Sequence, residues 1–246
     1  MVTPTDPEPR PRIPPWLSAR ERWEGLPRTS LSRNVREPDT KFLDVLRRRR
    51  SVPGSGPIST DDLSSILWHA TLLRERRAAT SEFPAWESRA APSAGGLHVI
   101  SLLCLPLAVD QPAGIYDPDR HELIALDQEC LAVTRRLNSE NIIEICGAVT
   151  GTSIQFVADM QRAEAAYEYC WSLVWRDAGA LVTTLALVAE ALGFAATPLG
   201  RVGSTIIRSA GLHAPRWRAV GALHITPQLV IGSEERSSTR ENESNL

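Results

Sequence analysis

Lysine is almost absent from this chain of 246 residues. Lys41 is the only lysine among 27 basic residues, so the remaining 26 are arginine. The codon usage of a GC-rich genome explains such a bias without any functional cause, but the bias has a chemical consequence. No lysine after position 41 can act as a catalytic base or complete a phosphate-binding P-loop.

Cysteine and histidine are also scarce, and no long hydrophobic run is present. The four cysteines, Cys104, Cys130, Cys146 and Cys170, form no Cys-x-x-Cys pair, and the five histidines are scattered, so no metal site is predicted. The longest apolar run, residues 178–192, is shorter than the ~20 residues that a membrane span needs. The N-terminus lacks the pattern of a secretory signal, so we expect a cytoplasmic protein.

Neither sign of charge is in excess. The formal net charge is -2, which gives no reason to expect a nucleic acid or an anionic membrane as a partner. Hydrophobic residues make up 43% and charged residues 23% of the chain, as is typical of a globular protein with its own core. We expect an extended arm over residues 1–38, one folded domain over residues 39–232 and a disordered polar tail over residues 233–246.

Helical and strand patterns alternate along the folded domain. We expect helices near residues 42–46, over 60–70 and over 160–174, strands over 97–107, 114–116, 122–126, 153–158, 195–199 and 219–226, and a polar loop over 75–91. Asp177 is predicted to open a further helix, apolar on nearly every side, that ends at Gly193. Such a helix must be covered by a sheet, by other helices or by a second subunit. The alternation indicates an α+β or α/β fold in which helices cover a sheet.

The densest charge lies at Arg47, Arg48, Arg49 and Arg50, which Ser51 follows. Arginines at the end of a helix interact favourably with the negative end of its dipole and can be purely structural. Guanidinium groups beside a hydroxyl also form a clamp for a phosphate group. The sequence leaves both interpretations open.

Two later segments consist mainly of small residues. Residues 91–96 read Ala-Pro-Ser-Ala-Gly-Gly, and residues 197–201 read Thr-Pro-Leu-Gly-Arg. Each segment is either a simple turn or a loop whose backbone amides can approach a flat ligand closely. Together with the arginine cluster, the two segments could converge in space on one phosphorylated cofactor.

Five groups of residues follow one another in an order that is typical of one family. They are Phe42, Leu46 and Arg49-Arg50-Ser51; Ile58-Ser59, Leu63, Leu67-Trp68 and Ala70; Arg89 and Pro92-Ser93-Ala94-Gly95-Gly96; Gly114-Ile115-Tyr116, Asp117-Pro118, His121 and Leu123; and Asp177-Ala178-Gly179, Leu185, Leu187, Ala189 and Leu192-Gly193. Over about residues 40–225 the chain resembles the nitroreductase superfamily. More narrowly, it resembles the SagB-type branch, which includes the azoline dehydrogenases of peptide natural-product biosynthesis.

The resemblance implies an α+β, nitroreductase-like fold with a central, mostly antiparallel sheet flanked by helices. It also implies an intertwined homodimer that holds FMN at the subunit interface. By position, it assigns the FMN phosphate and ribityl chain to Arg49, Arg50 and Ser51, the isoalloxazine ring to Pro92, Ser93, Ala94, Gly95 and Gly96, and the other flavin edge to Pro198, Leu199, Gly200 and Arg201.

One departure from the family's pattern concerns the phosphate. Pro53 stands where the family usually has a second basic residue, two places after the serine. Arg47, Arg48 or Arg236 could compensate for its absence.

The second departure concerns the catalytic base. Azoline dehydrogenases remove a proton with a Lys-Tyr pair, but residues 162–169 contain no lysine. Tyr167 is the first candidate for the base by the family's spacing, and Tyr169 and His98 are the next candidates. Tyrosine ordinarily ionises near pH 10, so a basic tyrosine needs a nearby cation, and Arg162 is the nearest in sequence. Tyr167 also fits the apolar stripe of its predicted helix, which would make it a core residue.

These features together predict an FMN-dependent oxidoreductase that moves a hydride between the flavin and a small molecule or peptide. The first candidate is a dehydrogenase of a peptide or heterocyclic intermediate in natural-product biosynthesis, working beside partner enzymes. An NAD(P)H-dependent reductase of nitro or ene compounds is the alternative. A flavin-free scaffold subunit of a biosynthetic complex is a further alternative, which Pro53 and the missing Lys-Tyr pair favour.

Overall fold

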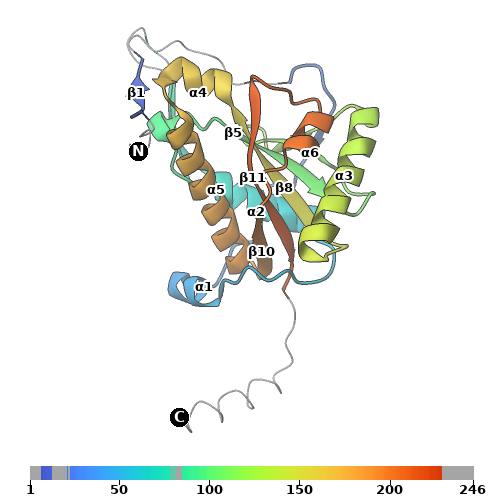
Figure 1. Cartoon of the computed structure of the whole chain (residues 1–246). Coiled ribbons are helices and arrows are strands. Elements are labelled where there is room, and N and C mark those ends of the chain that lie inside the picture. Colours follow the sequence, from blue (N-terminus) through green and yellow to red (C-terminus); the bar gives the residue numbers. More distant parts are fainter. Residues whose placement is uncertain (1–6, 13–20, 22, 79, 81–84, 229–246) are drawn as a thin grey trace, which may run out of the picture.

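The computed structural model describes residues 7–12, 21, 23–78, 80 and 85–228. In chain order the elements are β1 (Arg10–Pro11), β2 (Arg28–Ser30), α1 (Phe42–Arg48), α2 (Thr60–Thr71), β3 (Leu73–Arg77), β4 (Trp86–Arg89), the 3-10 turn η1 (Ala94–Gly96), β5 (Ile100–Pro106), β6 (Gly114–Asp117), β7 (Glu122–Ile124), α3 (Gln128–Cys146), β8 (Thr152–Asp159), α4 (Met160–Ala166), β9 (Tyr167–Glu168), α5 (Trp171–Ala191), β10 (Phe194–Leu199), α6 (Ser204–Ser209) and β11 (Trp217–Pro227). Helices α2 and α5 cover one face of a central sheet, and α3 and α6 cover the other (Figure 1).

The central sheet has seven strands in the order β10-β11-β8-β5-β6-β7-β2, and every neighbouring pair is antiparallel. All eight residues of β8 are buried, because helices pack on both faces of the strand. Alternate side chains enter different layers: Phe156 packs toward α2 and α5, and Val157 packs toward α6. The predicted α+β architecture with an antiparallel sheet flanked by helices is confirmed. Residues 28–30, which fall in the predicted arm, pair with β7 as an edge of this sheet.

The expected helix over residues 160–174 is wrong. Helix α4 ends at Ala166, the extended Tyr167 pairs with Pro11 of β1, and Tyr169 has a φ of 55°. Helix α5 then begins at Trp171, so Asp177 lies inside that helix rather than at its start. The helical spacing continues across the break because Tyr167 and Cys170 pack into the same core as the flanking turns.

The earlier start makes α5 longer than the apolar run in the sequence suggested. The helix has 21 residues and a mean hydropathy of 1.3 over its most apolar window, so by length and composition it could cross a membrane. The apolar run of residues 178–192 lies almost wholly within this longer helix, and the core helix of a protein outside a membrane can have the same length and composition. Only 28% of that window is buried within this chain. One face of α5 packs on α2, β10 and β11, and the other face keeps apolar side chains at the surface.

Two further elements differ from the sequence-based expectations. Residues 75–91 are not a loop, because β3 and β4 form a hairpin there. Helix α3 was not predicted, although its ends carry recognisable signals. Asp127 accepts hydrogen bonds from the first-turn amides of Glu129 and Cys130, and Gly147 closes the helix with a φ of 64°. The predicted tail over residues 233–246 lies outside the described residues.

Candidate functional site

The arginine cluster divides into two pairs at the end of α1. Arg47 and Arg48 lie in the last helical turn and bind carboxylates, those of Asp44 at 3.2 Å and Glu190 at 3.6 Å. Arg49 and Arg50 follow the helix and form no ion pair with any described residue. The dipole interpretation therefore fits the first pair, and the second pair keeps its charge available for a ligand.

Arg49 and Ser51 already lie in contact. The Arg49 Nη1 donates to Ser51 Oγ at 3.0 Å, and the Arg50 guanidinium donates to the carbonyl of Arg47 at 2.8 Å. The next turn is fixed to the end of β11, because the Gly54 N–H donates to Thr226 Oγ1 at 2.7 Å. A Cβ at Gly54 would lie 1.8 Å from the Pro227 carbonyl oxygen, so only glycine allows this approach.

The glycine loop, residues 92–96, is attached to α5 through the half-buried carboxylate of Asp177. Asp177 accepts hydrogen bonds from Ser93 Oγ at 2.5 Å and from the Ala94 N–H at 3.0 Å. Burial raises the pKa of Asp177, and the two hydrogen bonds act in the opposite direction. Gly95 and Gly96 have φ values of 57° and 62°, which side chains other than glycine rarely allow.

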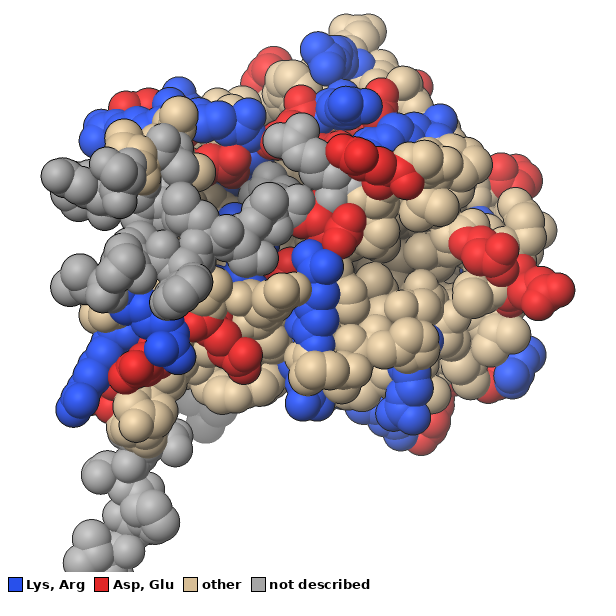
Figure 2. All heavy atoms as spheres, turned by 90° about the horizontal axis from the view of Figure 1, so that it is seen from above, with Lys and Arg blue, Asp and Glu red and all other residues tan. Residues whose placement is uncertain are grey.

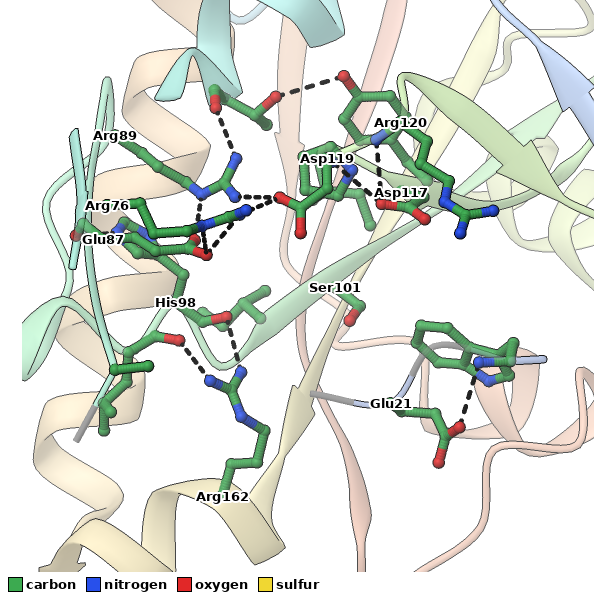
Figure 3. A pocket seen from close by; sticks show the side chains of 18 of the residues that line it. Glu21, Arg76, Glu87, Arg89, His98, Ser101, Asp117, Asp119, Arg120 and Arg162 are labelled. Atoms are coloured by element: carbon green, nitrogen blue, oxygen red, sulfur yellow. Dashed lines mark hydrogen bonds and ion pairs between the residues drawn. The ribbon is translucent and has the colours of Figure 1, made fainter. Parts of the chain in front are cut away.

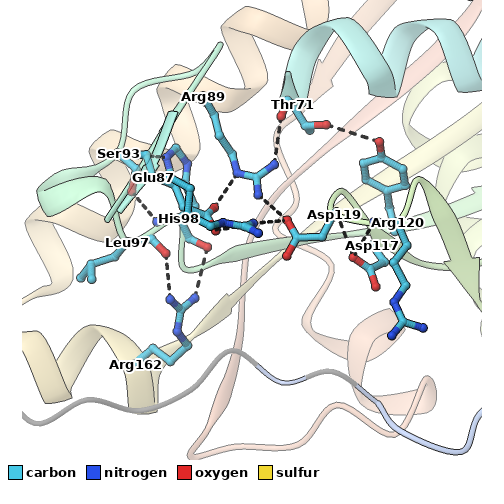
Figure 4. Close-up of polar contacts among 12 residues, drawn as sticks. Thr71, Glu87, Arg89, Ser93, Leu97, His98, Asp117, Asp119, Arg120 and Arg162 are labelled. Carbon is cyan, nitrogen blue, oxygen red and sulfur yellow. Dashed lines mark hydrogen bonds and ion pairs between the residues drawn. The ribbon is translucent and has the colours of Figure 1, made fainter. Parts of the chain in front are cut away.

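A cation holds the other end of the same loop. Arg162 of α4 donates to the carbonyl oxygens of Leu97 at 3.0 Å and His98 at 3.4 Å (Figure 4). His98 has a φ of 46°, so the loop leaves this contact through a third left-handed residue. The loop is therefore fixed at both ends. Asp177 accepts hydrogen bonds from its first residues, and Arg162 donates hydrogen bonds to the carbonyl groups that follow it.

Tyr167 is the candidate base that lies against the glycine loop. A Cβ on Gly95 would lie 2.6 Å from the Tyr167 hydroxyl, and this hydroxyl forms no hydrogen bond with any described residue. Tyr169 is exposed, and His98 Nε2 lies 3.0 Å from the Glu87 carbonyl oxygen. The Arg162 guanidinium donates to the carbonyl oxygens of Leu97 and His98. Among the described residues it forms no hydrogen bond with the Tyr167 hydroxyl, which the sequence had suggested as its partner.

The third predicted segment ends β10 at an edge of the sheet. Pro198 and Gly200 are exposed, and Leu199 is buried. Arg201 binds both carboxylate oxygens of Glu144 and, at 3.1 Å, Asn141 Oδ1, both on α3. Its guanidinium is therefore already engaged by this chain.

The predicted segments lie apart within one protomer. Arg48 contacts Glu190 near the C-terminal end of α5, whereas Ser93 contacts Asp177 near the N-terminal end. At 1.5 Å per residue, these two points on the helix are about 20 Å apart. Figure 1 shows α1 at one end of α5 and α4 at the other. One protomer alone does not bring the arginines and the glycine loop together.

A cavity that the sequence did not indicate lies beside the glycine loop. It has a volume of about 660 Å³, and Ala91, Leu97 and His98 belong to its wall. Four charged side chains form one connected group on this wall (Figure 3). They are Arg76, Glu87, Arg89 and Asp119, which we call the charge quartet.

The charge quartet joins the β3–β4 hairpin to the turn between β6 and β7. Arg76 contacts Glu87 at 2.7 Å and Asp119 at 2.6 Å, and Arg89 contacts both carboxylates at 2.7 Å. Arg89 is almost fully buried and also donates to the Thr71 carbonyl. In the sequence, Arg89 and Asp117-Pro118 stand out only as positions of the family resemblance, because the partners Arg89 and Asp119 are 30 residues apart and carry no local signal.

His121 fixes the hairpin that carries Asp119. Its Nδ1 lies 2.8 Å from the Tyr116 hydroxyl, its Nε2 lies 2.7 Å from Ser64 Oγ, and the side chain is buried. Burial lowers the pKa of His121, with a smaller opposing effect from the Ser32 carbonyl. The folded protein therefore binds this proton less readily than the unfolded chain, and stability is lost as the pH falls below the unfolded value of about 6.5.

We expect the free energy of unfolding to decrease between pH 7 and pH 5. The variant His121→Asn keeps a residue that tolerates the φ of 60° at this position and removes the titrating ring. Urea denaturation at both pH values should show a smaller decrease for this variant than for the wild type. His213→Asn, at an exposed histidine, is the matched control and should leave the decrease unchanged. His224, whose pKa burial also lowers, contributes to the decrease that remains. An unchanged pH dependence in His121→Asn would contradict the assignment.

Comparisons with known proteins place this fold in a class. No family model matches the chain, and neither does any curated protein sequence. A candidate nitroreductase from Ralstonia eutropha superposes on 89% of this chain and 94% of its own, with a TM-score of 0.58 and 20% identity. A candidate nitroreductase from Anabaena variabilis superposes on 90% of this chain with a TM-score of 0.60 and 15% identity, and the match spans 43% of that protein.

A third structure was crystallised with a cofactor. It is a candidate nitroreductase from Exiguobacterium sibiricum in complex with FMN, which superposes on 80% of this chain and 92% of its own, with a TM-score of 0.50 and 18% identity. At these identities the similarity establishes the architecture. The chain has a nitroreductase-like fold, as the order of its sequence motifs indicated.

Proposed function

We propose that this protein is an FMN-dependent oxidoreductase. The observation that carries the proposal is that Arg49 and Arg50, unlike Arg47 and Arg48, form no ion pair with a described residue and lie beside Ser51. Two guanidinium groups and a hydroxyl suit a phosphate dianion. The FMN complex of the Exiguobacterium sibiricum protein, which shares the fold, supports the choice of cofactor.

The described residues fit FMN chemically. Arg49, Arg50 and Ser51 would hold the phosphate, and the backbone of residues 92–96 would lie along the ring. The loop is suited to a flat ligand because Gly95 has no side chain and because Asp177 fixes the amide before it. Pro198, Leu199 and Gly200 would meet the other edge of the flavin. Bound FMN supplies hydride transfer at its N5 position, and the chain supplies position and environment.

A homodimer would complete this site. Trp171 and Trp175 are stacked on the outer face of α5 and are 42% and 47% exposed, and Phe42 of α1 is 64% exposed. Such an apolar face suits an interface between two copies. A two-fold axis beside α5 would bring the arginines of one protomer toward the glycine loop of its partner. Each site would then take its arginines from one protomer and its glycine loop from the other, although the two segments of a single protomer are about 20 Å apart.

Within such a site, Tyr167 would handle the proton that accompanies hydride transfer. Its hydroxyl lies against Gly95 and has no hydrogen-bond partner among the described residues, so it can face a substrate. We infer the SagB-type direction of reaction, oxidation of a peptide or small heterocycle in natural-product biosynthesis, from the order of the sequence motifs. The opposite direction, reduction of a nitro or ene compound by NAD(P)H, uses the same residues with Tyr167 as proton donor.

The visible spectrum of the purified protein tests this proposal. We expect flavin absorbance that remains with the protein through gel filtration, and FMN in the supernatant after denaturation. A colourless protein that does not bind added FMN would support the flavin-free scaffold instead.

A further inference from the structure

We propose that the 660 Å³ cavity is a second ligand site, which binds a short extended peptide or N-acyl amino acid through a secondary amide and a carboxylate. The cavity lies within one protomer, on the side of the glycine loop that Leu97 and His98 form. None of the residues assigned above to FMN is in its wall. The inference is therefore independent of the proposed flavin site.

The cavity exists because the central sheet separates between two strands. Strands β5 and β6 pair only at Leu103 with Ile115 and at Cys104 with Gly114. Beyond these pairs, side chains from both faces of the sheet line the same space. On β5 these are Leu102, whose side chain belongs to the layer of α2 and α5, and its neighbour Ser101, which points to the opposite face.

The separation leaves backbone hydrogen-bonding groups of β5 facing the cavity. Alternate residues of a strand direct their N–H and C=O groups to opposite neighbours. Toward β8, these groups come from odd-numbered residues, because the Leu107 N–H donates to the Gly151 carbonyl and the Val99 carbonyl accepts from the Asp159 N–H, both at 2.9 Å.

Ile100 is even-numbered, so its N–H and C=O point toward the β6 side. The β5–β6 ladder has already ended there, and Ile100 lines the cavity. One donor and one acceptor on a strand edge match the donor and acceptor of an extended amide, as in other peptide-binding sheets. The Ser101 hydroxyl, which has no hydrogen-bond partner among the described residues, lies beside them in the wall (Figure 3).

The charge quartet supplies the second point of recognition. The Nε and Nη2 of Arg76 bind the carboxylates of Glu87 and Asp119, and its Nη1 has no partner in the part of the chain that the structure describes. The Arg76 side chain is 44% exposed, whereas all three nitrogens of Arg89 are engaged. Two N–H groups of Arg76 are therefore available for a ligand carboxylate.

The rest of the wall decides the class of ligand. Apolar side chains, including Leu102, Ile124 and Leu181, alternate with charges of both signs. On the face seen in Figure 2, Lys/Arg and Asp/Glu side chains also stand side by side, so no patch of one sign dominates. A polyanion such as a nucleotide would meet Glu87 and Asp119 as well as the arginines. A small ligand with an apolar body, one amide and one carboxylate finds a complementary group for each part: the apolar side chains, the Ile100 backbone and Arg76.

Calorimetric titration with N-acetyl dipeptides that carry apolar side chains tests the site. We use each dipeptide as the free carboxylate, as the C-terminal amide, and with its central amide N-methylated, on protein with and without FMN. We expect saturable binding of the carboxylate form under both conditions. Capping the carboxylate should weaken binding by about ten- to a hundredfold, because a charge-assisted contact is lost. N-methylation, which removes the donor to Ile100, should weaken it by about tenfold.

Three variants locate the site. Arg76→Gln should reduce binding of the carboxylate form to that of the capped form and leave the capped form unchanged, since both changes remove one contact. Arg136→Gln removes an exposed, ion-paired arginine on α3 and should change nothing. Ser101→Phe should abolish binding by filling the cavity, with circular dichroism confirming the fold. Failure of every dipeptide to bind, or wild-type binding by Arg76→Gln and Ser101→Phe, overturns the proposal.

Discussion

Arg49→Ala should weaken FMN binding by about ten- to a hundredfold. Charge-assisted hydrogen bonds contribute roughly 1.5–3 kcal/mol each, and about 1.4 kcal/mol corresponds to a tenfold change in dissociation constant. Arg49 lies after the end of α1 and makes its described side-chain contact with Ser51, so its removal should leave the core intact. Fluorescence titration of the flavin-free protein with FMN gives the two dissociation constants.

Arg47→Ala is the matched control for this measurement. Arg47 belongs to the same cluster, but it lies in the last helical turn and already binds Asp44. We expect little change in FMN affinity, because this guanidinium is engaged within α1. Equal losses in the two variants would contradict the phosphate clamp and return the whole cluster to a role at the helix end.

Tyr167→Phe should slow substrate oxidation by about 10²-fold or more while FMN remains bound. The rate loss corresponds to the removal of one general acid–base group. The phenylalanine ring retains the packing against Gly95 and the core, so the fold and the flavin loop should be preserved. Stopped-flow measurement of flavin reduction by the substrate, at saturating concentration, reports the chemical step directly.

Tyr169→Phe provides the comparison for Tyr167. Tyr169 lies two residues later and is exposed, so its hydroxyl should be dispensable. Normal flavin reduction by Tyr167→Phe would make Tyr167 a core residue. The proton would then go to another group or to water.

The sheet and its helices were largely predictable because their signals are local. The helix over residues 60–70 has a serine cap, since Ser59 accepts from the Asp62 N–H, and its apolar residues face α5. The break at Tyr167 was not predictable in this way. It depends on the pairing of Tyr167 with Pro11, 156 positions away, and on the left-handed Tyr169.

In the candidate site, too, local segments were predictable from the sequence and contacts between distant residues were not. The sequence identified the arginine cluster and the glycine loop as segments, but not that Asp177 and Arg162 fix the loop from two different helices. It also gave no indication of the cavity. That space arises where β5 and β6 separate, and such a separation depends on the register of two strands rather than on the composition of either.

Sedimentation velocity, followed at both the protein band and the visible flavin band, tests whether two copies of this chain together bind FMN. In this arrangement the arginines of one copy face the glycine loop of the other. The arrangement predicts a single boundary with the mass of a dimer, in which the flavin absorbance moves with the protein at about one FMN per protomer. A colourless monomer at micromolar concentration that remains colourless after incubation with FMN would contradict it.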